Sequence, residues 1–517
     1  MSNRSKMAKS AVAMSMISVV SLAFSFLKES VFAYYFGASS MTDAFTIAIQ
    51  IPTTLFSLVS TAIGNVALPY YAREMANSGE EKASRYVSNL MTIVTLLSIT
   101  IVATLELIPG IVISVFAPGL STESSYLAAS LLRLVLPTVV LTELININTA
   151  VMNVNKSFVL PSLGSLVLNL AFVTTVACFA KAGGIYVAAW GTALGTVIEF
   201  GYSVLLRRKY LKYGWVCDIR DSDLIASVRK AVPIFVGIGA AEINKMVDTL
   251  VSSYLQPGAI SMLNYGSKLS SAASTLLVNS ITTVVYPEFA ESIALKDDAR
   301  LADSLVFSLR LILLIMLPVM VGGSILSREI ITIVYRRGAF SAETVDGTAP
   351  IFAAYLLCLL FIAIRQVSSR AFYAYGDTKT PMKNSLIGIA INIVLDLSVV
   401  KFFGAIGLAL ATTTANAVIS ILVLAELKKK NGSIDYIKIK SLVVRIVVAC
   451  LFMAIAISFG RYFIVSCNLL NLATFGGATM FILLSVVLGS GVYSGCLLLM
   501  KTEELLMVIQ TILRRKP

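Results

Sequence analysis

Long apolar runs separated by short polar connections follow one another along the 517-residue chain. A helix that crosses a bilayer needs roughly 20 mostly apolar residues, and 14 runs meet that length. Several exceed it, so we expect tilted, kinked or extended helices among them. The predicted spans are 10–36, 42–72, 84–116, 123–154, 158–180, 184–207, 224–256, 259–290, 300–335, 343–375, 381–402, 404–427, 440–465 and 470–500. The pattern predicts an all-α polytopic membrane protein with 14 transmembrane helices.

The composition agrees with this class and excludes several others. Hydrophobic residues make up 57% of the chain and charged residues 13%, whereas soluble proteins carry about 25% charged residues. A soluble enzyme, a disordered chain, a collagen and a coiled coil are therefore excluded. The chain has no histidine, which removes Ser-His-Asp triads and His-bound zinc. The connections are too short for a catalytic domain, so we expect a membrane protein that is not an enzyme.

The polar connections alternate in charge. The net charge is +13, and the connections on one side of the membrane carry 25 cations against 6 on the other. Cations placed between apolar runs indicate membrane orientation and anionic lipid headgroups rather than nucleic acid. The positive-inside rule then predicts that both termini lie in the cytoplasm. An even number of spans puts both termini on one side, so the span count and the charge bias support each other.

The two halves of the chain resemble each other at a spacing of about 220 residues. The matching pairs are 67–72 (ALPYYA) with 285–290 (VYPEFA), Pro161 with Pro381, and Gly184 with Gly404. Each half then holds six spans that run the same way through the membrane, related by an axis along the membrane normal. The alternative is chance similarity among apolar helices.

The repeat predicts the domain organisation. We expect two pseudo-symmetric six-helix lobes with a cleft between them, which is the geometry of alternating access. Two extra C-terminal helices lie outside the repeat, and the tail has the apolar spacing of an interfacial helix. The predicted boundaries are an N-lobe at 1–209, a cytoplasmic linker at 210–222, a C-lobe at 223–430, spans 13 and 14 at 431–500 and a cytoplasmic amphipathic tail at 501–517.

Four ionisable residues lie in the first two spans and in span 8. Lys28 and Glu29 interrupt the first span, Asp43 stands at the entry to span 2, and Lys268 lies in span 8. A charge at membrane depth is costly and therefore usually faces a cavity. These residues predict a cationic cavity for an anionic headgroup, in which the acids restrain the lysines. The alternative is that Lys28 and Glu29 form a structural pair and that Lys268 snorkels to the interface.

A second polar group lies mostly in the C-terminal half. Asn392 and Asp396 are four residues apart and share a helix face. Asp248 lies within span 7, and Thr412 lies early in span 12, which a short turn joins to span 11. Carboxylate, amide and hydroxyl oxygens suit a small hard cation rather than zinc or copper. The alternative, equal in weight on spacing alone, is a hydrogen-bonded cluster that joins helices.

Two sequence signatures resemble one protein family. The segments 338–341 (GAFS) and 370–381 (RAFYAYGDTKTP) closely resemble the signature of the MurJ/MviN family of lipid II flippases. The segments 36–38 (FGA), 42–45 (TDAF) and 51–52 (IP) resemble the first hairpin of that family. The predicted spans and the repeat extend the resemblance over essentially the whole chain.

The resemblance implies a fold, a substrate and a location. The fold is that of the multidrug/oligosaccharidyl-lipid/polysaccharide exporter superfamily, in the cytoplasmic membrane of a bacterium. The substrate is lipid II, the undecaprenyl-diphosphate-linked peptidoglycan precursor, which is flipped from the cytoplasmic to the outer leaflet for cell-wall synthesis. Spans 13 and 14 form a groove for the lipid tail. The expected partners are lipid II and membrane lipids, with a monomer that contacts the cell-wall synthesis machinery.

The resemblance also implies roles for individual residues. The substrate-cavity charges are Lys28, Glu29, Asp43 and Lys268. The sodium site comprises Asp248, Asn392, Asp396, Thr412 and the carbonyl of Leu408, with Na⁺ as the coupling ion and no other cofactor. The family usually has arginine where this chain has Lys28 and Lys268. Arginine binds a diphosphate with two parallel hydrogen bonds, whereas lysine acts as a point charge.

Three other functions are compatible with parts of this pattern. A sister flippase would move another polyprenyl-linked glycan, such as a capsule unit. A cation-coupled drug exporter of the same superfamily would need only twelve spans and no groove for a lipid tail. A membrane glycosyltransferase would need acidic motifs in sizeable aqueous loops, which the short connections leave no room for.

Overall fold

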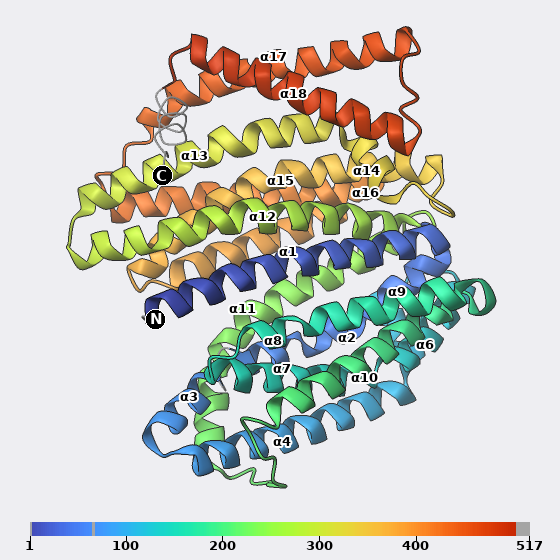
Figure 1. The fold of residues 1–517 in the computed structure, drawn as a ribbon, viewed down its shortest axis with the longest axis vertical. Helices are drawn as coiled ribbons and strands as arrows, with labels where there is room; N and C mark the ends of the chain where they lie inside the picture. The colour runs from blue at the N-terminus through green and yellow to red at the C-terminus, as the bar shows by residue number, and fades with distance from the viewer. Residues whose placement is uncertain (1–2, 65–67, 503–517) are drawn as a thin grey trace. The chain divides into compact units, whose positions relative to one another are not determined.

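The computed structural model describes residues 3–64 and 68–502, and the regular elements of these residues are all helices (Figure 1). They divide into two compact units, Met1–Ser261 and Met262–Pro517. Among the described residues, ten helices are long and apolar enough to cross a membrane, or eleven if a bent pair counts as one span. The chain is therefore a multi-pass α-helical membrane protein. The predicted tail lies outside the described residues from residue 503 onward.

The first unit packs both consecutive helices and helices that are distant in sequence. Helix α9 packs against α1 and α10, and α2 packs against α6 and α11. A core of buried Tyr70, Tyr86, Val87 and Ile147 joins α3, α4 and α7. The helices of this unit are α1 (Asn3–Phe36), α2 (Ser40–Ala62), α3 (Leu68–Asn77), α4 (Glu80–Leu107), α5 (Pro109–Phe116), α6 (Thr122–Val135), α7 (Thr138–Val154), α8 (Val159–Ser162), α9 (Gly164–Gly183), α10 (Tyr186–Arg207) and α11 (Ser222–Ser252).

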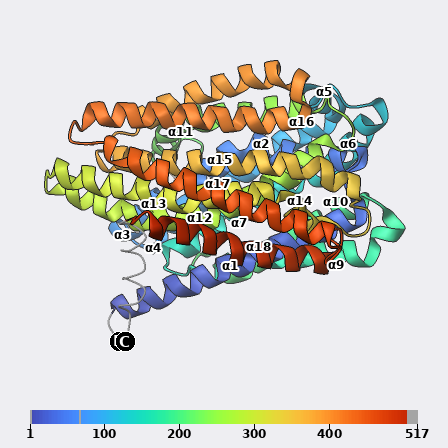
Figure 2. The ribbon, with the colours of Figure 1, turned by 90° about the horizontal axis from the view of Figure 1, so that it is seen from above.

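The second unit begins within α12 (Ala259–Ala294). Its other helices are α13 (Asp298–Ile325), α14 (Ser327–Tyr335), α15 (Ala342–Ala374), α16 (Lys379–Lys430), α17 (Ile437–Ser466) and α18 (Phe475–Leu499). Helix α15 packs against α13 and α16, while α17 and α18 lie side by side (Figures 1 and 2). The pair α17–α18 joins the rest of the unit through α13, where the Tyr493 hydroxyl donates to the Leu314 carbonyl at 2.8 Å.

Several predicted spans contain breaks that hydrophobicity alone does not show. The span 84–116 divides into α4 and α5 at Ile108, because Pro109 occupies the first position of the next helix. The span 123–154 bends by 42° between α6 and α7, next to Pro137. The two spans predicted at 381–402 and 404–427 form α16, which breaks at Gly404. Prolines and a glycine therefore set the breaks within the apolar runs.

Backbone conformation supports the predicted repeat. Residues with positive φ recur in pairs about 220 positions apart: Gly37 and Gly258, Gly79 and Lys296, Lys156 and Gly376, and Gly184 and Gly404. Gly184 has φ 58° and ψ −148°, and Gly404 has φ 55° and ψ −137°. These values are almost confined to glycine, so the same unusual turn recurs at matching points of the two halves.

Candidate functional site

Asp43, near the start of α2, caps the start of α12. Its carboxylate accepts hydrogen bonds from the Gly258 amide at 2.6 Å, the Ser261 amide at 2.7 Å and the Ser261 hydroxyl at 2.6 Å. The first amides of a helix have no partner within the helix, and a negative charge also complements the helix dipole. Asp43 is 3% exposed. We refer to Asp43, Gly258 and Ser261 as the Asp43 clasp.

Two glycines bring the backbone of the α11–α12 turn close to other parts of the first unit. The Gly119 amide donates to the Ser253 hydroxyl at 3.0 Å, and a Cβ on Gly119 would lie 2.6 Å from the Ser253 backbone. A Cβ on Gly258, whose φ is +89°, would lie 2.9 Å from the Ala38 carbonyl oxygen. Side chains at either position would therefore push this turn and the Asp43 clasp out of place.

Lys28 and Glu29 lie on α1 where this helix packs against α9. The Lys28 Nζ lies 4.8 Å from the centroid of the buried Phe172 ring, a distance typical of a cation–π contact. Phe172 in turn lies 6.3 Å from the Phe32 ring. Glu29 is 8% exposed. The Lys28 ammonium therefore faces α9 within the first unit, and its role in binding substrate stays a prediction.

Lys268 lies on α12 in the second unit, and its side chain is exposed. Its neighbour Ser270 donates to the Tyr355 carbonyl at 3.1 Å and so anchors this part of α12 to α15. Ser267 donates to the Asn264 carbonyl one turn earlier at 3.1 Å. The hydroxyls of the two serines thus donate to backbone carbonyls. The exposed Lys268 ammonium is the charged group of this segment, and its role in binding substrate stays a prediction.

The first signature segment builds the entry to α15. Phe340 is buried, and its ring centroid lies 5.4 Å from that of Tyr265 and 5.5 Å from that of Tyr335. Ser341 then caps α15, because its hydroxyl accepts the Thr344 amide at 3.2 Å. This part of the signature therefore holds α12, α14 and α15 together.

The second signature segment ends in a capped turn between α15 and α16. Asp377 accepts hydrogen bonds from the Thr380 amide at 3.0 Å and the Thr380 hydroxyl at 2.9 Å, and it pairs with Lys430 at 3.0 Å. The Thr380 amide foremost, together with Lys430, holds the pKa of Asp377 at about 2, below its ordinary value. Gly376, with φ 73°, permits the turn. This segment therefore fixes the two ends of α16 to each other.

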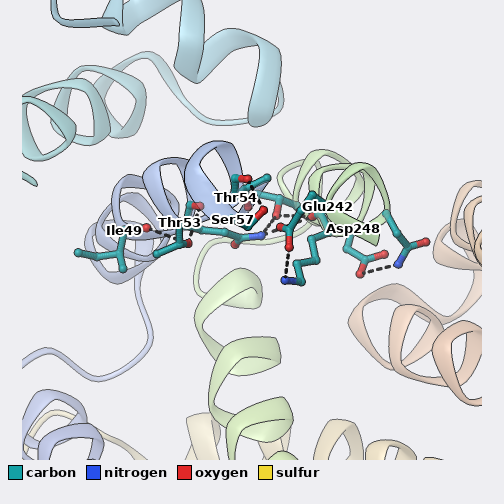
Figure 3. Close-up of polar contacts among 10 residues, drawn as sticks. Ile49, Thr53, Thr54, Ser57, Glu242 and Asp248 are labelled. Atoms are coloured by element: carbon teal, nitrogen blue, oxygen red, sulfur yellow. Dashed lines mark hydrogen bonds and ion pairs between the residues drawn. The ribbon is translucent and has the colours of Figure 1, made fainter. Parts of the chain in front are cut away.

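Asp248 lies on α11, next to a polar contact between α11 and α2 (Figure 3). On the side facing α2, Gln50 Nε2 donates to the Thr249 hydroxyl at 2.6 Å and lies 3.4 Å from the Lys245 carbonyl oxygen. Asp248 points away from α2 in Figure 3, and its Oδ2 lies 3.5 Å from the Asn244 amide nitrogen. Asp248 therefore belongs to a different face of α11 from the one that binds α2.

The other predicted sodium ligands lie on the two halves of α16. Asn392 Nδ2 donates to Asp396 Oδ2 at 2.5 Å, and both side chains are buried. Across the break, the Thr412 hydroxyl donates to the Leu408 carbonyl at 3.1 Å. All four residues thus lie in one helical hairpin of the second unit. Asp248 belongs to the first unit, so the complete ligand set stays a prediction.

Close packing of the two halves of α16 sets their register. A Cβ on Gly388 would lie 2.1 Å from the Ile419 side chain, and a Cβ on Gly407 would lie 3.1 Å from the Val399 carbonyl oxygen. This antiparallel register puts Asp396 at the level of the residues just after the break, near Leu408. The oxygen atoms of the two halves are thus available at one depth.

Glu143 on α7 is a buried carboxyl that the sequence analysis did not select. It is 1% exposed, and its Oε1 accepts a hydrogen bond from the Ser60 hydroxyl of α2 at 2.5 Å. Asn146 Nδ2 donates to the same hydroxyl at 3.2 Å. Its position within an apolar run is the signal that could have identified it. Glu143 therefore links the last turn of α2 to α7.

The described groups include cations and oxygen atoms that can bind ions of opposite charge. Lys28 and Lys268 each supply a cation for an anionic headgroup, and the oxygens of α16 suit a hard cation. Within the described residues, no cluster of three or more His, Cys, Asp or Glu side chains could hold a metal ion. The predicted ligands on α16 do not form such a cluster, because only Asp396 is a carboxylate and the other oxygens belong to amide, hydroxyl and carbonyl groups.

Comparisons with known proteins identify one family. The family model described as "Lipid II flippase MurJ" matches residues 32–472. The lipid II flippase MurJ of Burkholderia cenocepacia is 26% identical over 416 residues, which cover 78% of this chain and 80% of the relative. A protein of Buchnera aphidicola subsp. Baizongia pistaciae named "Probable lipid II flippase MurJ" is 25% identical over 474 residues, 89% of this chain and 91% of the relative.

Solved structures give the same result. The structure titled "Lipid II flippase MurJ, inward closed conformation" matches with a TM-score of 0.80 and 25% identity, over 98% of this chain and all of that chain. An inward-facing MATE family transporter of the MOP superfamily matches with a TM-score of 0.67 at 12% identity, over 82% of this chain and 98% of that chain, which shows the fold alone. The chain belongs to the lipid II flippase MurJ family.

Proposed function

We propose that this protein flips lipid II from the cytoplasmic to the outer leaflet by alternating access. The observation that carries the proposal is the family match over residues 32–472 together with a likeness in structure over 98% of the chain. The protein is a transporter in this proposal, and no covalent bond of the substrate is made or broken.

Lys28 and Lys268 bind the diphosphate in the proposed cycle. The position of Lys28 on a packed helix, with its Nζ 4.8 Å from the Phe172 ring centroid, supports this role, because a partly desolvated ammonium attracts an anion more strongly than a solvated one. Each lysine replaces an arginine that the family usually has. Binding therefore relies on charge more than on a fixed fork of donors.

The Asp43 clasp is the proposed closing contact at one end of the cycle. Three hydrogen bonds from Gly258 and Ser261 hold the start of α12 to α2. Alternating access needs contacts that form in one state and break in the other. A carboxylate bound to amides at a helix start suits this task, because water can replace the donors and solvate the carboxylate when the contact opens.

The proposed topology has fourteen spans with both termini in the cytoplasm of a bacterium. The eleven spans counted above rise to fourteen if α16 crosses twice at its Gly404 break and α11 and α12 each cross once. Helices α17 and α18 form the groove for the polyprenyl tail. Their exposed apolar side chains, such as Ile455 and Val487, support contact with lipid.

A sodium ion bound by Asp248, Asp396 and the neighbouring oxygens is the proposed coupling ion. The buried Asn392–Asp396 pair and the register of α16 support it, because several hard oxygens lie at one depth. The membrane potential is a further driving force, worth ~2.3 kcal/mol per charge moved through 100 mV.

Reconstituted flipping with defined lipids tests the proposed substrate. Proteoliposomes containing the full chain would receive lipid II, a second polyprenyl-linked glycan or a cationic drug in parallel, with protein-free vesicles as the control. We expect protein-dependent movement of lipid II and little movement of the others. Movement of the other glycan or of the drug without lipid II would contradict the proposal and favour a sister transporter.

A further inference from the structure

A polar cavity lies at the end of the second unit where α14, α15 and α17 meet. Its volume is about 430 Å³, within the range of small-molecule sites. Its lining includes Arg328, Glu329 and Arg336 from α14 and its end, Arg461 from α17, and Asn471 from the α17–α18 connection. The positive-inside prediction puts this end of the helices on the outer face, away from Lys428, Lys429 and Lys430.

The arginines of this cavity are not equivalent. Arg328 makes two contacts with the Asp346 carboxylate, at 2.7 and 3.1 Å, and Arg461 binds Glu329. Arg336 instead donates to the Ala473 carbonyl and pairs with no carboxylate among the described residues. The cavity therefore offers the guanidinium of Arg336, whose charge no carboxylate of the described residues neutralises.

The cavity also holds an acceptor without a donor. Glu329 is 1% exposed, and its Oε2 has no hydrogen-bond partner among the described residues. Burying a carboxylate oxygen without a hydrogen-bond donor costs free energy, so this atom indicates a ligand that donates a hydrogen bond to it. An occupant that satisfies both groups carries an anion for Arg336 and a hydroxyl or other donor for Glu329.

Exposed aromatic side chains surround this end of α17 and α18. Phe459, Tyr462 and Phe463 flank Arg461 on α17, and Phe475 follows the α17–α18 connection; all four are more than half exposed. Exposed aromatic residues at helix ends are typical of the membrane–water interface. The cavity thus lies at the level of lipid headgroups, which favours a lipid over a free solute.

We propose that this cavity binds the headgroup of an anionic glycerophospholipid of the phosphatidylglycerol type. The phosphate pairs with Arg336, a glycerol hydroxyl donates to Glu329 Oε2, and the acyl chains lie along the exposed apolar faces of α17 and α18. A diphosphate headgroup that carries sugars is larger than this cavity, which favours the phospholipid. Binding of this headgroup does not require the proposed flipping activity.

Native mass spectrometry of the detergent-solubilised full chain measures this binding without transport. Phosphatidylglycerol and phosphatidylcholine of matched chain length would be titrated separately, because choline offers no hydroxyl donor. We expect tighter binding of phosphatidylglycerol to the wild type. Arg336→Gln should weaken it about tenfold, the effect of losing a charge-assisted hydrogen bond. Arg337→Gln is the matched control, since Arg337 is the next residue, donates to the Ile333 carbonyl and stacks on Phe475 outside the cavity lining.

Several results would overturn the site. Equal binding of the two phospholipids would contradict a hydrogen bond from the glycerol hydroxyl to Glu329. Equal losses of phosphatidylglycerol affinity in Arg336→Gln and Arg337→Gln would show that general surface charge, not this cavity, binds the lipid. Tighter binding of lipid II than of phosphatidylglycerol would overturn the choice of lipid. If Arg336→Gln fails to fold, displacement of phosphatidylglycerol from the wild type by glycerol phosphate, but not by choline phosphate, supports the site, and no displacement refutes it.

Discussion

The chain builds one helical hairpin twice, as α9–α10 and as the two halves of α16, and the two copies carry different chemistry. Both turn at a glycine with almost the same backbone angles, Gly184 and Gly404. At a spacing of 220 residues, the predicted ion ligands of α16 correspond to mainly apolar residues of α9 and α10. The pairs are Phe172 with Asn392, Val176 with Asp396, Ala188 with Leu408, and Thr192 with Thr412.

The difference shows how one backbone plan can serve two kinds of charge. In the first copy, the Phe172 ring lies under a fixed cation, the Lys28 ammonium, at 4.8 Å. In the second copy, the matching position is Asn392, bonded to the buried Asp396. The first hairpin thus faces a cation that belongs to the chain, whereas the second carries buried oxygen atoms that we propose bind a cation from solution. The repeat places residues at matching positions of the two hairpins, and the side chains at those positions determine which group each hairpin can bind.

Matched substitutions in the two hairpins give the largest expected contrast. Asp396→Ala should lower the sodium dependence of lipid II flipping by at least about fivefold, the lower end of typical coupling between two ligands. Val176→Ala, at the corresponding position of α9, should leave that dependence unchanged. The measurement is the flipping rate in proteoliposomes with sodium replaced by choline. Full sodium dependence in Asp396→Ala would remove the ion site from α16.

Substitution of the two turn glycines should lower the stability of the protein by similar amounts. Gly184→Ala and Gly404→Ala should each destabilise the protein by about 1–3 kcal/mol, because a Cβ strains this backbone region. No neighbouring atom lies within 4 Å of either added Cβ, so conformation alone sets the cost. Thermal unfolding in detergent measures both. A large loss at one glycine and none at the other would show that the two turns are not equivalent.

Acid should affect the α15–α16 turn and spare its counterpart in the first half, where Ser157 stands in place of Asp377. Because the pKa of Asp377 is lowered to about 2 from 3.8, its bonds stabilise the fold fully above pH 3.8 and are lost as the pH falls through about 2. Hydrogen exchange of residues 375–382 should rise over that window, with little change at 155–162. Asp377→Asn should reproduce the loss at neutral pH, and unchanged exchange in that variant would contradict the role of the carboxylate.

Local sequence signals predicted the features that depend on short segments. The apolar runs predict a multi-pass helical protein, and the pair Gly184 and Gly404 indicates the repeat that the matching backbone angles support. The family signature at 370–381 was recognisable because a tight turn constrains neighbouring residues such as Gly376 and Asp377. Each of these signals depends on a few neighbouring residues, so it can be recognised in a single sequence.

Contacts between distant segments could not be predicted in this way. Asp43 appeared as a cavity charge, but its donors lie 215 and 218 residues away, at the start of another helix. Arg461 of α17 likewise binds Glu329, which lies 132 residues away. Periodicity and composition contain no information on such pairs. The break between α13 and α14 at Leu326, within the predicted span 300–335, also has no proline next to it, and hydrophobicity does not reveal it.

The rate of lipid II flipping by two variants at one position tests the central claim most directly. Lys28→Ala removes the internal cation and should slow flipping roughly ten- to a hundredfold, in line with the loss of a hydrogen bond to a charged group worth about 1.5–3 kcal/mol. Lys28→Arg keeps the charge and adds the fork that the family usually has, so it should flip at least as fast as the wild type. Wild-type flipping by Lys28→Ala, in protein that folds and inserts normally, would contradict the claim that this cation binds the substrate.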